Sequence, residues 1–170
     1  MKKAILVILA IILFIAPCFV WGHMIVKSLQ FSADCTGYLK LAGDANNIDV
    51  AEKHLSTAIA YIENNGMTSG HTKIIRYYPT NDFGLWYENL KTAQTQLQEM
   101  QAREYTELEE SNMLMKLRET LLNEEGSVTH PEGAPFKDSY SLVFWLALLL
   151  WIPCWVLGCV FVVAAFDLWW

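Results

Sequence analysis

Two long stretches of the sequence, residues 4–21 and residues 142–166, lack Asp, Glu, Lys and Arg altogether. A bilayer core is about 30 Å thick, and a helix needs roughly 20 apolar residues to cross it. Each stretch therefore predicts a transmembrane helix rather than a buried helix of a soluble core. Pathways for ions or protons normally contain ionisable residues within the membrane, so their absence disfavours a transporter or channel formed by this chain alone.

The sequence also has few residues that could form a catalytic or metal site. Of its four cysteines, only Cys35 lies between the two uncharged stretches, so that region has no internal disulfide. No His-x₃-His or Cys-x₂-Cys spacing is present, so a metal centre is not expected. No nucleophile elbow, phosphate-binding loop or dinucleotide fingerprint is present. We therefore expect no catalytic residue, no metal and no cofactor, and the chain is predicted not to be an enzyme.

Basic charge is scarce between the two stretches. Residues 27–139 contain ten of the 12 Lys and Arg of the chain, because Lys2 and Lys3 lie before this region. The same region contains all of the 18 Asp and Glu except Asp167. Ten positive against seventeen negative side chains give a net charge of about −7 for this region. Such a balance argues against binding to nucleic acid or to an anionic lipid surface.

These features divide the sequence into three parts. Residues 1–26 are predicted to be a transmembrane signal-anchor, residues 27–139 an extracytoplasmic helical domain, and residues 140–170 a second transmembrane helix. A cleaved signal peptide is the alternative for the first part, but no A-x-A cleavage pattern follows it. Lys2 and Lys3 favour a cytoplasmic N-terminus. We expect a multi-pass protein of a bacterial-type inner membrane, with both termini cytoplasmic and the central domain periplasmic or extracellular.

The central region reads as a bundle of three helices, the last one long. Residues 24–42 continue the first helix, residues 48–64 carry apolar side chains three and four apart as in a coiled coil, and residues 83–124 form the long helix. Asn47 is the expected N-cap of the second helix, and Gly66 follows its end. A compact bundle is favoured over a tall stalk of stacked helices. Residues 126–136 are interpreted as a short linker. The predicted fold class is thus an all-α membrane protein.

Aromatic residues gather around the start of the predicted long helix, between positions 77 and 87. One interpretation is a cap on the bundle core, with Asp82 as the N-cap. The other is a pocket or a partner-docking surface, since Tyr and Trp are common at interfaces. Trp86 is predicted to be mostly buried, and at least one tyrosine is predicted to be exposed. The candidate residues for the patch are Arg76, Tyr77, Tyr78, Trp86 and Tyr87.

Two pairs of small residues four positions apart lie in or at the edge of the predicted spans. Cys18 pairs with Gly22, and Cys154 pairs with Gly158. Small residues at this spacing let membrane helices approach closely, although the pattern is also frequent by chance. These four residues are candidates for helix packing in the membrane.

The combined features favour an interaction protein without enzymatic activity: an accessory subunit, assembly factor or scaffold. We expect membrane lipid and either a protein partner or a second copy of the chain as its neighbours. The alternative is an extracytoplasmic sensor that binds a ligand and signals through a separate membrane partner. Its order of span, helical domain and span is similar in architecture to the sensor half of bacterial chemoreceptors and histidine kinases, and no motif accompanies that similarity.

Overall fold

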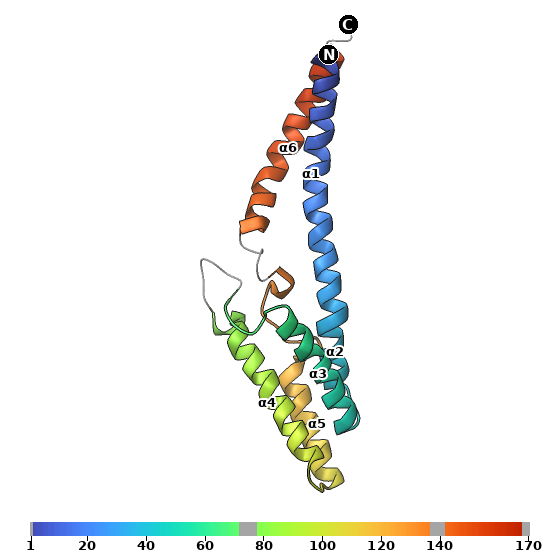
Figure 1. The fold of residues 1–170 in the computed structure, drawn as a ribbon, viewed down its shortest axis with the longest axis vertical. Coiled ribbons are helices and arrows are strands. Elements are labelled where there is room, and N and C mark those ends of the chain that lie inside the picture. Colours follow the sequence, from blue (N-terminus) through green and yellow to red (C-terminus); the bar gives the residue numbers. More distant parts are fainter. Residues whose placement is uncertain (1, 72–77, 137–141, 168–170) are drawn as a thin grey trace. The chain divides into compact units, whose positions relative to one another are not determined.

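The computed structural model describes residues 2–71, 78–136 and 142–167. Over these ranges the chain forms helices and two isolated bridges but no strand, so the all-helical fold class is confirmed (Figure 1). The elements in chain order are α1 Lys2–Phe31, the π-helical segment η1 Ser32–Thr36, α2 Gly37–Gly43, α3 Ile48–Asn64, the 3₁₀ turn η2 Pro79–Asn81, α4 Phe83–Gln101, α5 Glu107–Leu121, the 3₁₀ turn η3 Ala134–Phe136 and α6 Leu142–Asp167.

The chain divides into two compact units. The terminal unit comprises Met1–Lys27 and Ser139–Trp170, and the central unit is Ser28–Asp138. None of the helices, over the residues that the structure describes, is both long and apolar enough to cross a membrane. The two membrane spans in the predicted fold class are therefore without support from the structure.

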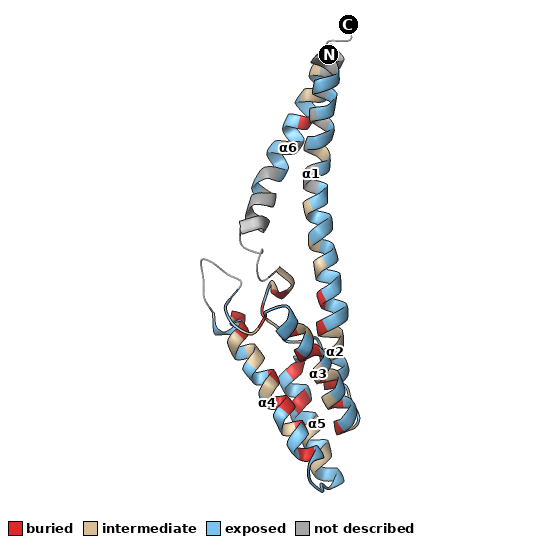
Figure 2. Cartoon of the chain, in the orientation of Figure 1, coloured by how far each residue is buried: buried red, intermediate tan, exposed pale blue. Residues whose placement is uncertain are grey.

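Within the terminal unit, α6 packs against α1 through aromatic rings. Phe14 of α1 lies edge-on against Trp155 of α6, with ring centroids 4.7 Å apart and an angle of 78° between the ring planes. Many large apolar side chains of both helices are nevertheless exposed, as the pale blue of these helices in Figure 2 shows.

The predicted helix over residues 48–64 is confirmed as α3. Asn47 caps its start, because the Asn47 side chain accepts a hydrogen bond of 2.8 Å from the backbone N–H of Val50. Beyond its end, Gly66 has a φ of 64°, a left-handed conformation that glycine adopts without steric cost. Local sequence signals therefore define both ends of this helix.

The core of the central unit lies between α3 and its neighbours. α3 packs against α2 and α4, and α2 also packs against α5. The compact bundle predicted from the short turn at residues 43–47 is thus confirmed, and Figure 2 shows the buried residues concentrated in it. The side chains that α3 and α4 bury are Ile48, Ala51, Leu55, Ala58, Ile59, Ile62, Phe83, Leu90, Ala93, Gln94, Leu97 and Met100.

The predicted long helix over residues 83–124 is wrong, because the chain turns between α4 and α5. Thr106 accepts a hydrogen bond from the backbone N–H of Glu109, and Glu109 accepts one from the backbone N–H of Thr106. This reciprocal capping box starts a new helix and satisfies two N–H groups that the helix end leaves without partners. The break lets α5 fold back onto α2 and α4, so the bundle has one more helix than predicted.

The predicted linker over residues 126–136 is also wrong, because this segment packs on the bundle. We call residues 122–136 the strap. Leu122 and Val128 form an isolated bridge, and the backbone N–H of Thr129 donates to the Leu121 carbonyl at 2.9 Å. Pro131 and Ala134 are buried. The prolines and glycines, whose presence suggested a linker, form turns instead. The segment that they belong to contributes to the core.

Candidate partner-docking site

The first turn of α4 is fixed by hydrogen bonds to its N-cap residue and to the segment that precedes it in the chain. The Asp82 carboxylate accepts from the backbone N–H groups of Gly84 at 2.7 Å and Leu85 at 3.2 Å, as an N-cap does. The backbone N–H of Phe83 donates to the carbonyl of Gly70 at 2.9 Å, and His71 and Asp82 form an isolated bridge. The aromatic residues that follow are therefore held on a rigid helix start.

Trp86 joins this helix start to the strap. Its indole Nε1 donates a hydrogen bond of 3.0 Å to the Thr129 carbonyl, and its ring lies 6.2 Å from that of Phe83 at 70°. Phe83 is fully buried, and Trp86 packs against the core with only an intermediate exposure, so the prediction that Trp86 is mostly buried is confirmed. The indole N–H of Trp86 has its acceptor on the strap.

Tyr87 joins α4 to α3. Its hydroxyl donates to the Glu63 carboxylate at 2.6 Å, and the Lys91 Nζ lies 3.6 Å from the same oxygen. The hydrogen bond to Glu63 is the main reason that the pKa of Tyr87 is raised above its usual value of 10.0, with smaller contributions from burial and from the negative charge of Glu63. Like that of Trp86, the polar group of Tyr87 already has a structural partner within the bundle.

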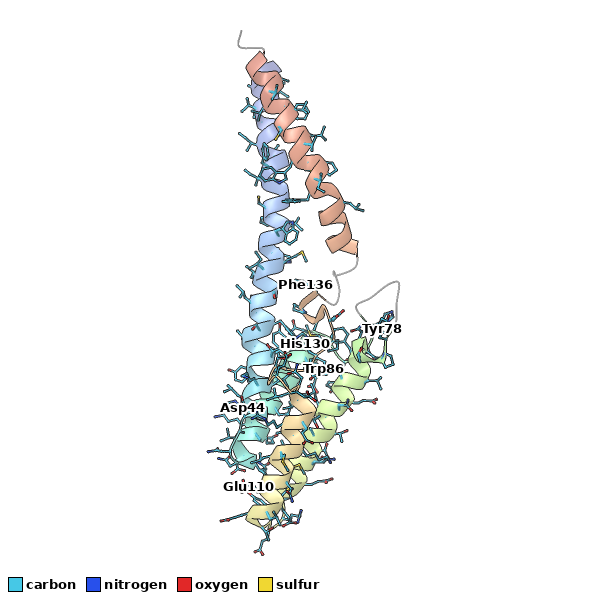
Figure 3. The ribbon with its side chains drawn as sticks, turned by 180° about the vertical axis from the view of Figure 1, so that it is seen from behind. Asp44, Tyr78, Trp86, Glu110, His130 and Phe136 are labelled. Atoms are coloured by element: carbon cyan, nitrogen blue, oxygen red, sulfur yellow. The ribbon has the colours of Figure 1, made fainter. Side chains whose placement is uncertain are left out.

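Tyr78 is the member of the predicted patch that presents its side chain to solvent. It is 43 % exposed, which confirms that at least one tyrosine of the patch is exposed. Leu85, in the first turn of α4, is 47 % exposed and adds an apolar group to the same region of the chain. Figure 3 shows Tyr78 at the edge of the bundle near the start of α4. Arg76 and Tyr77 lie outside the described residues.

The small-residue pairs have different surroundings. A Cβ added at Gly158 of α6 lies 2.9 Å from two ring atoms of Phe14, so this glycine forms the notch into which Phe14 fits. Cys154, one turn earlier, is half-buried. In contrast, a Cβ at Gly22 meets no atom within 4 Å among the described residues, and Cys18 is exposed. Only the second pair lies at a close helix contact in the described part of the chain.

Within the described ranges, no group of three or more His, Cys, Asp and Glu side chains is placed to hold a metal ion. Burial raises the pKa of the Cys35 thiol to about 12, so the thiol stays protonated and unreactive at neutral pH. A depression of about 510 Å³ is open to solvent and follows α4 from Tyr87 to Glu99. A small ligand there is enclosed by little apolar surface.

Two structural residues of this region, Glu63 and Thr129, were not predicted from the sequence. Glu63 lies in the last turn of α3 and accepts its hydrogen bond from Tyr87 of α4. A contact between side chains of two different helices has no recognisable spacing in the sequence. Thr129 contributes only a backbone carbonyl, which every residue carries.

Comparison with known proteins gives no match: no family model, no curated protein and no solved structure is significantly similar to this chain.

Proposed function

We propose that this chain is an interaction protein without enzymatic activity in a bacterial-type inner membrane, acting as an accessory subunit, assembly factor or scaffold. In this proposal α1 and α6 lie in the lipid, both termini face the cytoplasm, and the central unit is displayed on the periplasmic or extracellular side. The central unit then docks a protein partner, and Tyr78 is the aromatic residue that contacts it.

The observation that carries the proposal is the outward orientation of large apolar side chains in the terminal unit. Ile12 of α1 is 55 % exposed and Ile152 of α6 is 64 % exposed, and neighbouring positions on both helices are similar. Monomers in water rarely expose contiguous apolar surface of this extent. The uncharged stretches 4–21 and 142–166 have the length that lipid requires, which favours a bilayer as the surrounding medium.

The proposed orientation is tested by reporter fusions. A reporter that is active only outside the cytoplasm is fused after residue 65 in the turn following α3, and in a second chain after residue 170. The lysines at positions 2 and 3 predict activity at residue 65 and none at residue 170. Activity at residue 170 contradicts the proposed topology.

The role of Tyr78 is tested by photo-crosslinking from its position. A photoreactive amino acid replaces Tyr78 in one chain and Tyr105 in a matched control, because Tyr105 is also exposed, at 37 %, but lies between α4 and α5. We expect one specific crosslinked product from position 78 and none from position 105. A product containing two copies of the chain identifies a homo-oligomer, and a product with another protein identifies the partner. Equal products from both positions contradict a docking site at Tyr78.

The alternative, a ligand-binding sensor, stays a prediction with a different test. A ligand that binds only the folded state raises the melting temperature by mass action. The open groove along α4 supplies polar groups but little enclosure, so it favours the interaction protein over the sensor. A small molecule that raises the melting temperature of the central unit and fails to do so after Lys91→Ala reverses that preference.

A further inference from the structure

The strap is attached to the bundle mainly through side chains and single hydrogen bonds. Two backbone hydrogen bonds join it to α5, from Leu122 to the Arg118 carbonyl at 2.8 Å and from Thr129 to the Leu121 carbonyl at 2.9 Å. Lys40 of α2 donates to the Gly126 carbonyl at 2.9 Å, and Trp86 of α4 donates to the Thr129 carbonyl at 3.0 Å. Segments held by few backbone hydrogen bonds open at lower free energy than helices that share a core.

The attachment is concentrated around Thr129 and His130. The His130 ring lies edge-on against Phe31, with centroids 5.3 Å apart and an angle of 81° between the ring planes. Trp86 and Phe31 therefore hold two successive strap residues from two different helices, α4 and α1. Pro131, which follows directly, is fully buried. Figure 3 shows Trp86 and His130 close together in the bundle.

The core between α3 and α4 does not depend on the strap. α3 buries Leu55, Ile59 and Ile62, and α4 buries Leu90 and Leu97, all in direct packing between helices. The strap adds the buried Leu122, Pro131 and Ala134 and the partly buried Val128 beside this packing. Release of the strap exposes these side chains and leaves the direct packing between α3 and α4 in place.

We propose that the hydrogen bond from Trp86 to the Thr129 carbonyl is a conformational latch, which holds the strap on the bundle and frees it without unfolding the helices. Trp86 is only half-buried, so water or another acceptor reaches its N–H when the bond opens. A released strap spans about 50 Å when fully extended.

The latch lies in the first two turns of α4, on the same helix start as Asp82 and Leu85. A partner that contacts this helix start therefore acts directly on the residue that holds the strap. The latch itself is an intramolecular device: its existence goes beyond the proposed docking function, and its test needs no partner.

Amide hydrogen exchange of the full chain in detergent micelles tests the latch. Trp86→Phe keeps an aromatic ring against Phe83 but removes the N–H donor. We expect the strap amides to exchange roughly five- to tenfold faster, the factor that corresponds to loss of one hydrogen bond. The strap amides that donate to backbone carbonyls are those of Leu122, Asn123, Gly126, Thr129, Ala134 and Phe136. The amides of α3 are expected to keep their exchange rates.

Tyr87→Phe is the matched control, because it removes a hydroxyl that bonds Glu63 and not the strap. Unchanged strap exchange in Trp86→Phe overturns the proposal, and so does equal acceleration of the strap in both variants. If Trp86→Phe does not fold, His130→Ala replaces it, since it removes the contact with Phe31 from the strap itself. Faster strap exchange with unchanged α3 exchange then supports the latch, and unchanged strap exchange overturns it.

Discussion

The terminal and central units use apolar residues in opposite ways. In the central unit, α3 places its apolar side chains on one face and buries them, so that Ile48, Leu55 and Ile62 are inaccessible to solvent. In the terminal unit, α1 and α6 carry apolar side chains all round and expose many of them. A helix with one apolar face needs only neighbouring helices to cover it, whereas a helix that is apolar all round needs an apolar medium. The proposed function assigns the two units to two different solvents on the basis of this difference.

The packing contacts differ in the same way. The central unit combines its core with hydrogen bonds and ion pairs between helices, such as Arg118 to Asp44 at 2.6 Å and Ile48 N–H to Glu110 at 3.2 Å. In the terminal unit the contacts described between α1 and α6 are a ring pair, Phe14 with Trp155, and a notch at Gly158. Close packing at small residues is the form that helix association takes where burial from water gives no driving force.

Truncation of an isoleucine to alanine is expected to give the largest contrast in stability between the two units. Ile62→Ala in the central unit deletes a fully buried side chain and should lower the free energy of unfolding by about 2–5 kcal/mol. Ile12→Ala in the terminal unit deletes an exposed one and should change it by less than about 1 kcal/mol in detergent. Urea unfolding followed by circular dichroism measures both. Equal losses for the two variants contradict the comparison.

Glycine substitution tests the packing of the terminal unit. Gly158→Ala places a methyl group 2.9 Å from the Phe14 ring, which must move, and should weaken the pairing of α1 with α6 by about 1–3 kcal/mol. Gly22→Ala is the control, because its methyl group meets nothing within 4 Å among the described residues. The indole proton resonance of Trp155 should shift in the first variant and stay in place in the second. A resonance that is unmoved in both would show that Phe14 does not occupy the notch.

Loss of the α5 cap has a smaller effect. Thr106→Ala removes the hydroxyl that accepts from the Glu109 N–H and should cost about 1 kcal/mol. Thr95→Ala, in the interior of α4, removes a hydroxyl that bonds only to the Lys91 carbonyl of its own helix. Alanine is the better helix former there, so this control should be as stable as the original chain or slightly more stable. Equal destabilisation by both changes would argue against a helix start at Thr106.

The acid sensitivity of the same cap is the smallest expected effect. The backbone N–H of Thr106, followed by Arg103 and the Thr106 hydroxyl, lowers the pKa of Glu109 below its ordinary value of 4.5. A lowered folded-state pKa means that the charged form stabilises the fold above pH 4.5, and that this contribution is lost as pH falls through the folded-state pKa.

Glu109→Gln should therefore reduce the loss of stability between pH 5 and pH 3, measured as the urea midpoint at each pH, whereas Glu119→Gln at an exposed position of α5 should leave the original slope. A slope that Glu109→Gln does not change means that the carboxylate contributes nothing to the cap.

The helix α3 was predictable because its signals are local. Asn47 and Gly66 mark its ends, and the apolar spacing marks its buried face. The break before α5 has a local signal too, the spacing of Thr106 and Glu109, but the apolar spacing that Tyr105 and Leu108 continue suggested an unbroken helix. Capping residues were thus more informative than apolar spacing at this position.

The site was less predictable, because its decisive contacts join distant parts of the chain. The alternation of neighbouring side chains predicted that at least one tyrosine is exposed, but it did not identify Tyr78. The hydrogen bonds of Trp86 and Tyr87 did not follow, since one acceptor is a backbone carbonyl and the other a carboxylate from another helix. Which aromatic residue is structural and which is available to a partner depends on these tertiary contacts.

Paramagnetic broadening of methyl resonances in lipid nanodiscs tests most directly whether the two units lie in two solvents. One sample contains a spin label attached to the lipid chains, and the other a water-soluble gadolinium chelate. The account predicts that the lipid label broadens Ile12 and Ile152, and that the chelate broadens the exposed Leu108 and Met115 of α5. Broadening of Ile12 and Ile152 by the chelate as strong as that of Leu108 would contradict it.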